Sequence, residues 1–302
     1  MNLHRAIRIL PFATCLCATG FACLPVAANA AVATIPHDEA MPWAPGDTAP
    51  AFVPDGSTVI FARGKGTSRR LYVSHHHDGR WSKPDEAPFS GRWMDIEPAM
   101  SPDGSYLVFI SNRPAKSGGK ALDGYFGGKL HTGRGGNLWR VAFRDGKWGM
   151  PVRLPDAVNA STSMYSPAVA ADGSLYFTRP DPHTGHTRLY ASRRVGGRYQ
   201  PSRPVTFSDG VASDYDPAVA PDQSFIVFSS DRAPTPPNHS GLFIAFAAHG
   251  AWSTPIAMGV YGYEARLSPD LATLYFNADG DQRIHAMPIG VWLQRNRPVA
   301  ER

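Results

Sequence analysis

Six carboxylates and three tyrosines occupy the three positions before a proline that recurs along this sequence, and these residues are its best candidates for chemistry. The carboxylates are Asp47, Asp95, Glu97, Asp214, Asp216 and Glu264, and the tyrosines are Tyr165, Tyr215 and Tyr263. Carboxylates bind hard cations, and tyrosines offer flat amphipathic faces to a polar ligand such as a sugar. We expect the repeats to bring these residues to one rim, and all of them except Asp214 are our candidate ligand-binding residues.

The same acids also have a structural interpretation. Aspartate side chains often bond to nearby backbone amides and organise turns. We expect this role for the acids three positions before the proline, which are Asp47, Asp95 and Asp214. The acids one position before the proline fit a ligand-binding role and a structural role equally well. Arg113 and Arg232 lie at equivalent places, and we expect them to pair with acids between repeats.

The run His75-His76-His77-Asp78 is a weak candidate for a metal site. On a strand, His75 and His77 would share one face and could chelate a metal ion. The equivalent places of the other repeats carry unrelated residues of an exposed turn, which favours a solvent-exposed turn here. We therefore predict no metal site and no cofactor, although the acids would allow a structural divalent cation.

Searches for catalytic motifs find none. The chain has no Gly-x-Ser-x-Gly elbow, no His-Glu-x-x-His and no P-loop, and no candidate cysteine nucleophile. Two of the rim acids could still serve a glycoside hydrolase or lyase, because such enzymes act through a pair of carboxyl groups. We predict a binding protein rather than an enzyme and keep a carbohydrate-active enzyme as the alternative.

The elements that must position these residues are β-hairpins that occur five times. Their turn aspartates are spaced 48, 69, 50 and 48 residues apart and are Asp55, Asp103, Asp172, Asp222 and Asp270. In the second repeat Pro102 presets φ, Asp103 bonds to its own backbone and Gly104 accepts a positive φ, so the three form a tight turn. The apolar run 106–110 that follows has no helical period and predicts a β-strand.

Further strand signals complete each repeat. In the first four repeats a Leu-aromatic pair follows the hairpin, and later comes an aromatic residue preceded two positions earlier by glycine; these aromatics are Trp81, Trp148, Tyr199 and Trp252. A four-stranded unit of about 50 residues cannot bury both faces alone, whereas units stacked around an axis bury them and protect the sheet edges. The sequence therefore predicts an all-β fold, a β-propeller of four-stranded blades, with five blades favoured over six.

Two repeats depart from this pattern. The fifth lacks the glycine-aromatic signal, so we predict that residues 31–44 supply its outer strand and that the chain termini close the ring. The alternative is that residues 291–293 complete it in line. The second repeat carries an insertion, residues 114–136, that is rich in glycine and lysine. Such an insertion either touches a ligand or partner or is merely mobile.

The hairpin unit resembles the Pro-Asp repeat (PD40, a WD40-like unit) of TolB-like β-propellers. The matching residues are Asp95, Pro98, Ser101, Pro102, Asp103, Gly104, Phe109, Ser111 and Arg113 in the second repeat, and Asp214, Pro217, Pro221, Asp222, Phe228, Ser230 and Arg232 in the fourth. The resemblance covers nearly all of the chain after residue 30. Departures are Gln223 and Leu271 in place of the turn glycine, Ala171 in place of the turn proline, and five repeats where the namesake has six.

The resemblance implies an exported propeller that binds or scaffolds, and it implies no specific reaction, because fold alone does not give function. The namesake reaches its partners, a lipoprotein and colicin-related proteins, partly through an extra N-terminal domain. We expect no room for such a domain here, so we do not carry those partners over.

The first thirty residues read as a secretory signal peptide. Arg5 and Arg8 form a positive start, an apolar stretch follows, and residues 28–30 offer a small-x-small cleavage site. We predict residues 1–30 to be this signal and residues 31–302 to be one propeller domain. All three cysteines lie within the signal, so we expect no disulfides in the mature chain.

Charge and hydropathy exclude two classes of partner. After residue 30 the chain has 28 basic and 25 acidic residues, a formal charge of +3, which is too mild to indicate nucleic-acid binding. No later segment approaches the roughly 18 apolar residues of a membrane span. We therefore predict a periplasmic or secreted monomer that acts as a binding or scaffold module of the cell envelope. Its expected partner is a protein or an envelope glycan, and the sequence names neither.

Overall fold

Turns that contain the repeated aspartate join the first two strands of each repeat, as the sequence predicts. The computed structural model describes residues 40–296, so the predicted signal peptide and residues 31–39 lie outside the described part. In the second repeat, Asp103 Oδ1 accepts hydrogen bonds from the Ser105 amide at 3.0 Å and from the Ser101 hydroxyl at 2.6 Å. The turn aspartates of the other four repeats accept the amide two residues later in the same way.

The first three repeats form separate antiparallel sheets. The first, in the order β1-β2-β3-β4 with β5 also on β3, consists of β1 (Thr48–Phe52), β2 (Thr58–Arg63), β3 (Arg70–His77), β4 (Arg80–Trp81) and β5 (Asp85–Glu86), with the 3-10 turn η1 (Gly66–Ser68) before β3. The second, in the order β6-β7-β10-β11 with β12 also on β10, consists of β6 (Asp95–Met100), β7 (Tyr106–Ser111), β10 (Asn137–Arg144), β11 (Lys147–Trp148) and β12 (Val152–Arg153). The third, in the order β13-β14-β15-β18, consists of β13 (Tyr165–Val169), β14 (Leu175–Pro180), β15 (Thr187–Ser192) and β18 (Arg203–Pro204). Two small hairpins lie outside these sheets: β8 (Gly124–Phe126) with β9 (Lys129–His131), and β16 (Arg194–Val195) with β17 (Arg198–Tyr199).

The fourth and fifth repeats share one strand. Their strands are β19 (Asp214–Val219), β20 (Phe225–Ser230), β21 (Gly241–Ala248), β22 (Ala251–Trp252), β23 (Ile256–Leu267), β24 (Thr273–Ala278) and β25 (Ile284–Pro288). The start of β23 pairs with β21 and its end, from Gly262, pairs with β24. The helix α1 (Gly290–Asn296) follows β25. Within residues 40–296 no helix combines the length and the apolarity that a membrane span requires.

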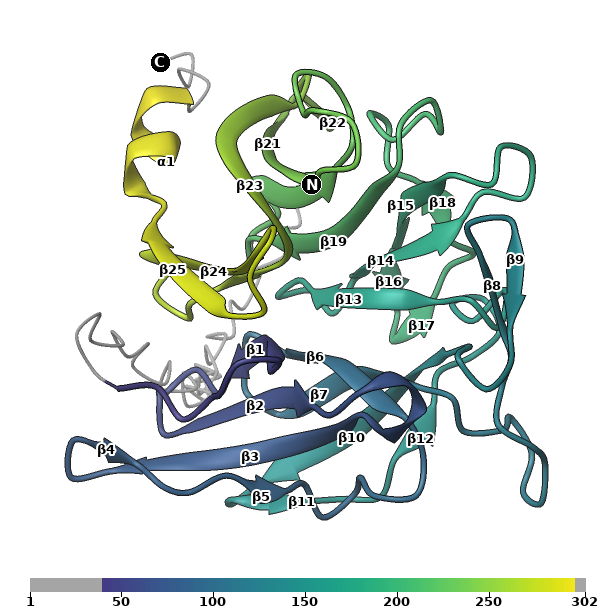
Figure 1. The fold of residues 1–302 in the computed structure, drawn as a ribbon, viewed down its shortest axis with the longest axis vertical. Helices are drawn as coiled ribbons and strands as arrows, with labels where there is room; N and C mark the ends of the chain where they lie inside the picture. Colours follow the sequence, from purple (N-terminus) through teal and green to yellow (C-terminus); the bar gives the residue numbers. More distant parts are fainter. Residues whose placement is uncertain (1–39, 297–302) are drawn as a thin grey trace, which may run out of the picture.

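The innermost strands of successive repeats lie against one another. Strand β6 contacts β1 and β13, β19 contacts β13 and β23, and β1 contacts β23 and β24. Figure 1 shows these strands toward the middle of the molecule, with β4, β11 and the β8–β9 hairpin at its edge. The strands that carry the three positions before the repeated proline therefore lie next to one another.

The structure tests only part of the prediction for the fifth repeat. Residues 40–44 form no strand, and residues 31–39 lie outside the described part, so a pairing strand there stays a prediction. Residues 291–293, the alternative, lie in α1 rather than in a strand, because Trp292 and Leu293 pack on the apolar cluster that contains Phe276 and Ile289. The in-line alternative is therefore wrong, because residues 291–293 are helical.

Side chains join the first repeat to the last. Trp43 makes edge-to-face contacts with Phe52 of β1 at 6.3 Å and with Tyr275 of β24 at 5.7 Å between ring centroids. The Asn277 side chain donates to the Asp47 carbonyl at 3.3 Å, and the Gly46 amide donates to the carbonyl of Gln282 at 2.6 Å. These contacts join the two ends of the described chain without strand pairing between them.

Three buried ion pairs fasten the first strand of a repeat to the second. Asp47 binds Arg63 through two hydrogen bonds of 2.8 and 2.6 Å, Asp95 binds Arg113 at 2.9 Å, and Asp214 binds Arg232 at 2.6 Å through each of its oxygens. Each guanidinium lies over the repeat's phenylalanine, at 5.2 to 5.4 Å from the ring centroid. Burial raises the pKa of Asp95 to about 6, against the attraction of Arg113.

These pairs correct two expectations. Asp47, Asp95 and Asp214 organise their strands mainly by binding arginine rather than by bonding backbone amides, although Asp47 also accepts the Ala44 amide. Arg113 and Arg232 pair with acids of their own repeat and not with acids of a neighbouring one. The expectation of a structural role for the three aspartates is consistent with their burial, because Asp95 and Asp214 have no exposed surface.

Removal of one partner of such a pair leaves the other charge buried and unpaired, which costs about 3–5 kcal/mol. We therefore expect Asp214→Ala to lower the free energy of unfolding by that amount in urea titrations. The matched control is Asp156→Ala, since Asp156 pairs with Arg153 but its side chain is 87% exposed. An exposed pair contributes at most about 1 kcal/mol. Equal losses in the two variants would contradict the proposed role of the buried pair.

Candidate functional site

One residue in each innermost strand has a left-handed backbone. It is the residue directly before the repeated proline position, and the five residues, with φ between 49° and 55°, are Ala49, Glu97, Ser166, Asp216 and Glu264. The strand register shifts at this point in all five inner strands, as in a β-bulge. Such a conformation costs a residue other than glycine on the order of 1 kcal/mol and is typical of functional or tightly constrained sites. The bulge directs these side chains out of the sheets and toward the neighbouring repeats.

The bulge residues bind one another across repeats. Glu97 Oε2 accepts the Ser166 amide at 2.6 Å, and Asp216 accepts the Ser166 hydroxyl at 2.5 Å. The second oxygen of Asp216 accepts the Glu264 amide at 2.8 Å. Glu264 lies 3.8 Å from Arg69 of the first repeat, which also donates to the Thr48 hydroxyl. Glu97 and Asp216 therefore take the amide-binding role that we expected of the acids three positions before the proline, whereas the Glu264 carboxylate faces Arg69.

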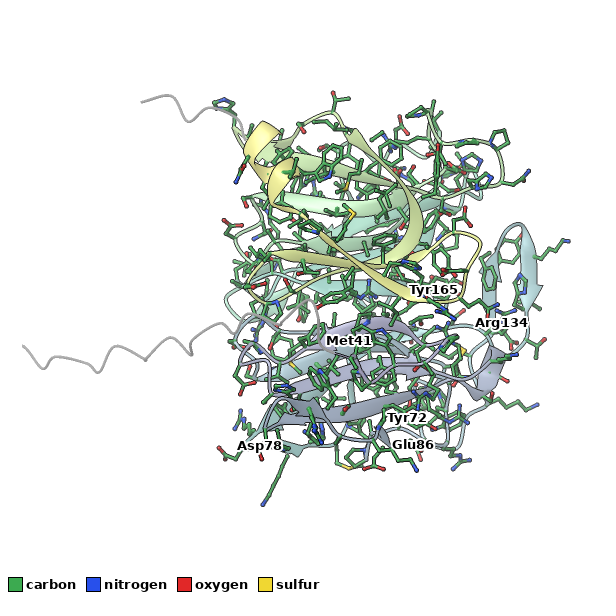
Figure 2. The ribbon with its side chains drawn as sticks, turned by 60° about the vertical axis from the view of Figure 1, so that its left-hand side comes forward. Met41, Tyr72, Asp78, Glu86, Arg134 and Tyr165 are labelled. Atoms are coloured by element: carbon green, nitrogen blue, oxygen red, sulfur yellow. The ribbon has the colours of Figure 1, made fainter. Side chains whose placement is uncertain are left out.

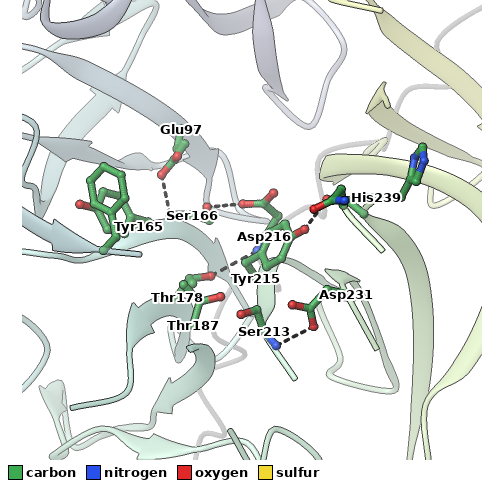
Figure 3. A pocket seen from close by; sticks show the side chains of 13 residues that line it. Glu97, Tyr165, Ser166, Thr178, Thr187, Ser213, Tyr215, Asp216, Asp231 and His239 are labelled. Carbon is green, nitrogen blue, oxygen red and sulfur yellow. Dashed lines mark hydrogen bonds between the residues drawn. The ribbon is translucent and has the colours of Figure 1, made fainter. Parts of the chain in front are cut away.

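A cavity of about 600 Å³ opens above this cluster (Figure 3). Its inner wall includes Glu97, Tyr165, Ser166, Tyr215 and Asp216. Its outer wall comes mainly from the third and fourth repeats and includes Thr178, Thr187, Ser213, Asp231, Asn238, His239 and Ser240. The volume lies within the range of small-molecule sites, roughly 300 to 1,000 Å³. We call this cavity the rim pocket.

The insertion of the second repeat forms one side of the rim pocket. Its hairpin β8–β9 places Phe126 in the pocket wall, stacked on His131 at 3.8 Å and edge-to-face with Tyr165 at 5.8 Å between ring centroids. The Tyr165 hydroxyl donates to the Arg134 carbonyl at 3.2 Å, and the Tyr125 amide donates to the Ser163 hydroxyl at 2.7 Å. Figure 2 shows Tyr165 and Arg134 at the base of this hairpin. The insertion is thus fixed to the third repeat beside the pocket.

Burial shifts the pKa of Glu97 and of two tyrosines in the pocket. Burial, together with the nearby charges of Glu264 and Asp216, raises the pKa of Glu97 from the ordinary 4.5 to about 7, against the Ser166 amide and Arg69. Burial also raises the pKa of Glu264, opposed by Arg69. It raises the pKa of Tyr165 and of Tyr215 to about 12. The Glu97 carboxyl therefore changes its charge near neutral pH.

The candidate residues from the sequence separate into three groups. Glu97, Tyr165, Tyr215 and Asp216 line the rim pocket. Glu264 and Tyr263 do not line it, although Glu264 touches the same cluster through its amide. Asp47 and Asp95 lie in the ion pairs of the inner strands. Sequence reasoning missed the walls supplied by Phe126, Asp231 and residues 238–240, for which the long insertion and the proline-rich loop 234–237 were the available signals.

The three histidines do not form a metal site with other ligands. The His75 ring bonds to the Thr58 hydroxyl at 3.0 Å, and its centroid lies 6.3 Å from that of His77. His76 packs on Trp81 at 5.0 Å. Within residues 40–296, no group of three or more His, Cys, Asp or Glu side chains is placed to hold a metal ion.

Comparison with known proteins concerns the fold. No protein-family model matches the sequence, and no curated protein matches it. Similar solved structures include TolB from Acinetobacter baumannii (13% identity, TM-score 0.49, 81% of this chain and 52% of that chain), putative TolB from Agrobacterium tumefaciens (16%, 0.41, 81% and 91%) and a thermostable family-43 glycoside hydrolase (10%, 0.53, 81% and 90%). The chain thus spans about half of the Acinetobacter structure.

The fold is all-β, built from repeated antiparallel sheets, and the chain resembles the TolB-like β-propellers. The Pro-Asp repeats resemble those of this family, and TolB structures are among the folds to which the chain is similar. At identities of 10 to 16% the likeness concerns the fold alone.

The raised pKa of Glu97 has a consequence for stability. Between pH 4.5 and about 7 the folded protein holds a proton on Glu97 that the unfolded chain releases, so the free energy of unfolding falls as pH rises through this window. Glu97→Gln removes this pH-dependent contribution to the free energy of unfolding and keeps a side-chain oxygen that can accept the Ser166 amide. We expect the stability of Glu97→Gln relative to the wild type to rise by roughly 2–3 kcal/mol from pH 4.5 to about 8.

The measurement is urea unfolding of both proteins across this pH range, with Asp156→Asn as an exposed control that should show no such trend. A pH-independent difference between Glu97→Gln and the wild type would mean that Glu97 ionises at its ordinary pKa.

Proposed function

We propose that the mature protein is an exported, non-catalytic TolB-like β-propeller of the cell envelope that binds a small polar ligand in the rim pocket. The observation that carries the proposal is the pocket itself: four of the eight candidate residues from the sequence line one cavity of ligand size. The left-handed bulges that hold Glu97 and Asp216 are fixed by bonds between repeats. A preformed site of this kind binds without first having to order its walls.

The architecture we infer for it is a ring of five blades, one for each Pro-Asp repeat. The contacts of β1 with β23 and β24 support a ring that closes between the first and fifth blades. Export rests on the signal-peptide features of residues 1–30, and a periplasmic or secreted location follows from export. We further propose that the protein is a monomer and that its partner is another protein or a glycan of the cell envelope.

A carbohydrate-active enzyme is the second candidate, and one observation favours it. Glu97 and Asp216 both line the rim pocket and both bind Ser166, so two carboxyl groups lie close together. A carboxyl with a pKa of about 7 is suited to donate a proton at neutral pH. The family-43 glycoside hydrolase shares the fold at 10% identity, which supports no transfer of its activity.

Thermal unfolding of the mature protein against defined sugars, amino sugars, amino acids and diamines tests the binding proposal. A ligand of the native state raises the melting temperature by mass action, and at 100 times its Kd it adds about 2.7 kcal/mol. We expect at least one compound to do so, and the shift to shrink in Asp216→Asn and Phe126→Ala but not in Glu86→Gln, an exposed acid of β5.

Two results would count against the proposal. A shift that persists in both pocket variants would place the ligand elsewhere. Chromatography of the incubated compounds separates binding from catalysis, and the appearance of cleavage products that Asp216→Asn does not form would establish the enzyme instead.

A further inference from the structure

We propose that the rim pocket selects ligands that carry a primary ammonium group, in preference to neutral polyols of the same shape. The inference rests on the proposed function and names the class of ligand that the same site takes. It comes from the charges that line the pocket, from one unused acceptor within it and from its aromatic walls.

The lining is acidic and lacks a strong cation. Glu97, Asp216 and Asp231 contribute carboxyl groups, and none of the thirteen lining residues is lysine or arginine. Two guanidinium groups beside the cluster have partners within the protein: Arg69 faces Glu264 at 3.8 Å, and Arg134 lies over Phe126 at 5.8 Å from its ring centroid. The lining His239 is bound to Asp279 at 2.9 Å. An anionic ligand would meet repulsion here, whereas a cation would offset the carboxylates.

Glu97 offers an acceptor that the protein does not use. The residue is only 7% exposed, and its Oε2 is occupied by the Ser166 amide. Among the described residues no donor binds its other oxygen, and Glu97 belongs to the pocket wall. A buried carboxylate with a free oxygen is costly unless a charged donor meets it. An ammonium group supplies up to three donors and no acceptor, so it fits this position.

Aromatic rings surround the same space. The Phe126 and Tyr165 rings meet edge to face with centroids 5.8 Å apart. Tyr215 also lines the pocket, and its hydroxyl is hydrogen-bonded to that of Ser240. A cation over an aromatic face gains about 0.5 to 2 kcal/mol. A bare divalent ion fits less well, because within residues 40–296 no group of three acids or histidines is placed to hold one. The hydroxyls of Thr187 and Ser213 also line the pocket, and the Thr178 hydroxyl, which accepts the Asp216 amide at 3.2 Å, can still donate to the rest of the ligand.

Binding of a cation should be coupled to the protonation of Glu97. The groups that face Glu97 are Glu264 and Asp216, which oppose its ionisation, Arg69, which favours it, and Tyr165. A bound ammonium adds a second favourable charge, so the ligand binds to the ionised form and releases a proton below about pH 7. With a pKa of about 7, the ionised fraction falls roughly tenfold from pH 8 to pH 6, and affinity falls with it.

Isothermal titration calorimetry of the mature protein at about pH 8 provides the test. The probes are glucosamine with glucose and N-acetylglucosamine as neutral counterparts, and 1,5-diaminopentane with 1,5-pentanediol. We expect at least one ammonium compound to bind ten or more times as tightly as its neutral counterparts. 1,5-Diaminopentane, whose amines stay protonated over this pH range, should bind about tenfold more weakly at pH 6 than at pH 8. Comparison of the sugar probes with the alkyl probes shows whether the pocket binds an ammonium group on a sugar ring or on an alkyl chain.

Variants connect the result to the site. Glu97→Gln should abolish both the preference for the ammonium and its pH dependence, while Glu86→Gln, the same change on exposed β5, should alter neither. Circular dichroism must show that Glu97→Gln is folded. Phe126→Ala, which changes only the insertion's hairpin wall, should weaken ammonium binding several-fold by a route that does not involve Glu97.

Three outcomes would overturn the inference. Equal affinity for neutral and ammonium probes would do so and would leave the proposed binding function standing. Ammonium binding that survives both Glu97→Gln and Phe126→Ala would place it outside the pocket. The absence of binding by any of the five probes would reject the ammonium class. If the wider compound panel also gave no thermal shift, the proposed function would fail as well.

Discussion

The left-handed residue before the repeated proline is the constraint on which much of this structure depends. A strand that kept regular geometry there would direct the side chain onto a sheet face, between neighbouring repeats. The bulge instead sends Glu97, Ser166 and Asp216 toward the centre, where each binds the bulge of another repeat. The bulges of the second to fifth repeats therefore bond to one another, and Glu97, Ser166 and Asp216 form part of the polar lining of the rim pocket. The contacts between repeats and the candidate site thus both depend on the left-handed conformation of these residues.

The repeat uses two acids for two different purposes. The acid three positions before the proline forms an ion pair with an arginine of its own repeat, and this arginine lies over the repeat's phenylalanine. Asp214 pairs in this way with Arg232, which lies over Phe228. The acid one position before the proline reaches across to the next repeat. Ala49 and Ser166 at that second position show that the fold does not require an acid there. Carboxylates at Glu97, Asp216 and Glu264 are therefore the part of the pattern that function has to explain.

Much of the fold followed from the sequence because its signals are local. Pro102-Asp103-Gly104 encodes a turn within three residues, and the spacing of such turns encodes the repeat. The rim was predictable in outline for the same reason, and four of its predicted residues line the pocket. The choice between amide and arginine for Asp95 was not predictable, since it depends on where Arg113 lies after pairing. Phe126 was not predictable either, because only the docking of the insertion on Ser163 and Tyr165 brings it to the pocket.

Strand β23 has a consequence for how the molecule can come apart. It leaves the sheet of the fourth repeat and enters the sheet of the fifth without a break, so these two repeats share a backbone and must lose structure together. The opposite boundary, between the last repeat and the first, is joined by Trp43, Asn277 and Gly46, without strand pairing among the described residues. The fourth and fifth repeats are thus joined by a continuous strand, whereas the last and first repeats are joined by side-chain and loop contacts. A transient local opening of the fold would begin between the last and first repeats and leave the fourth and fifth repeats paired.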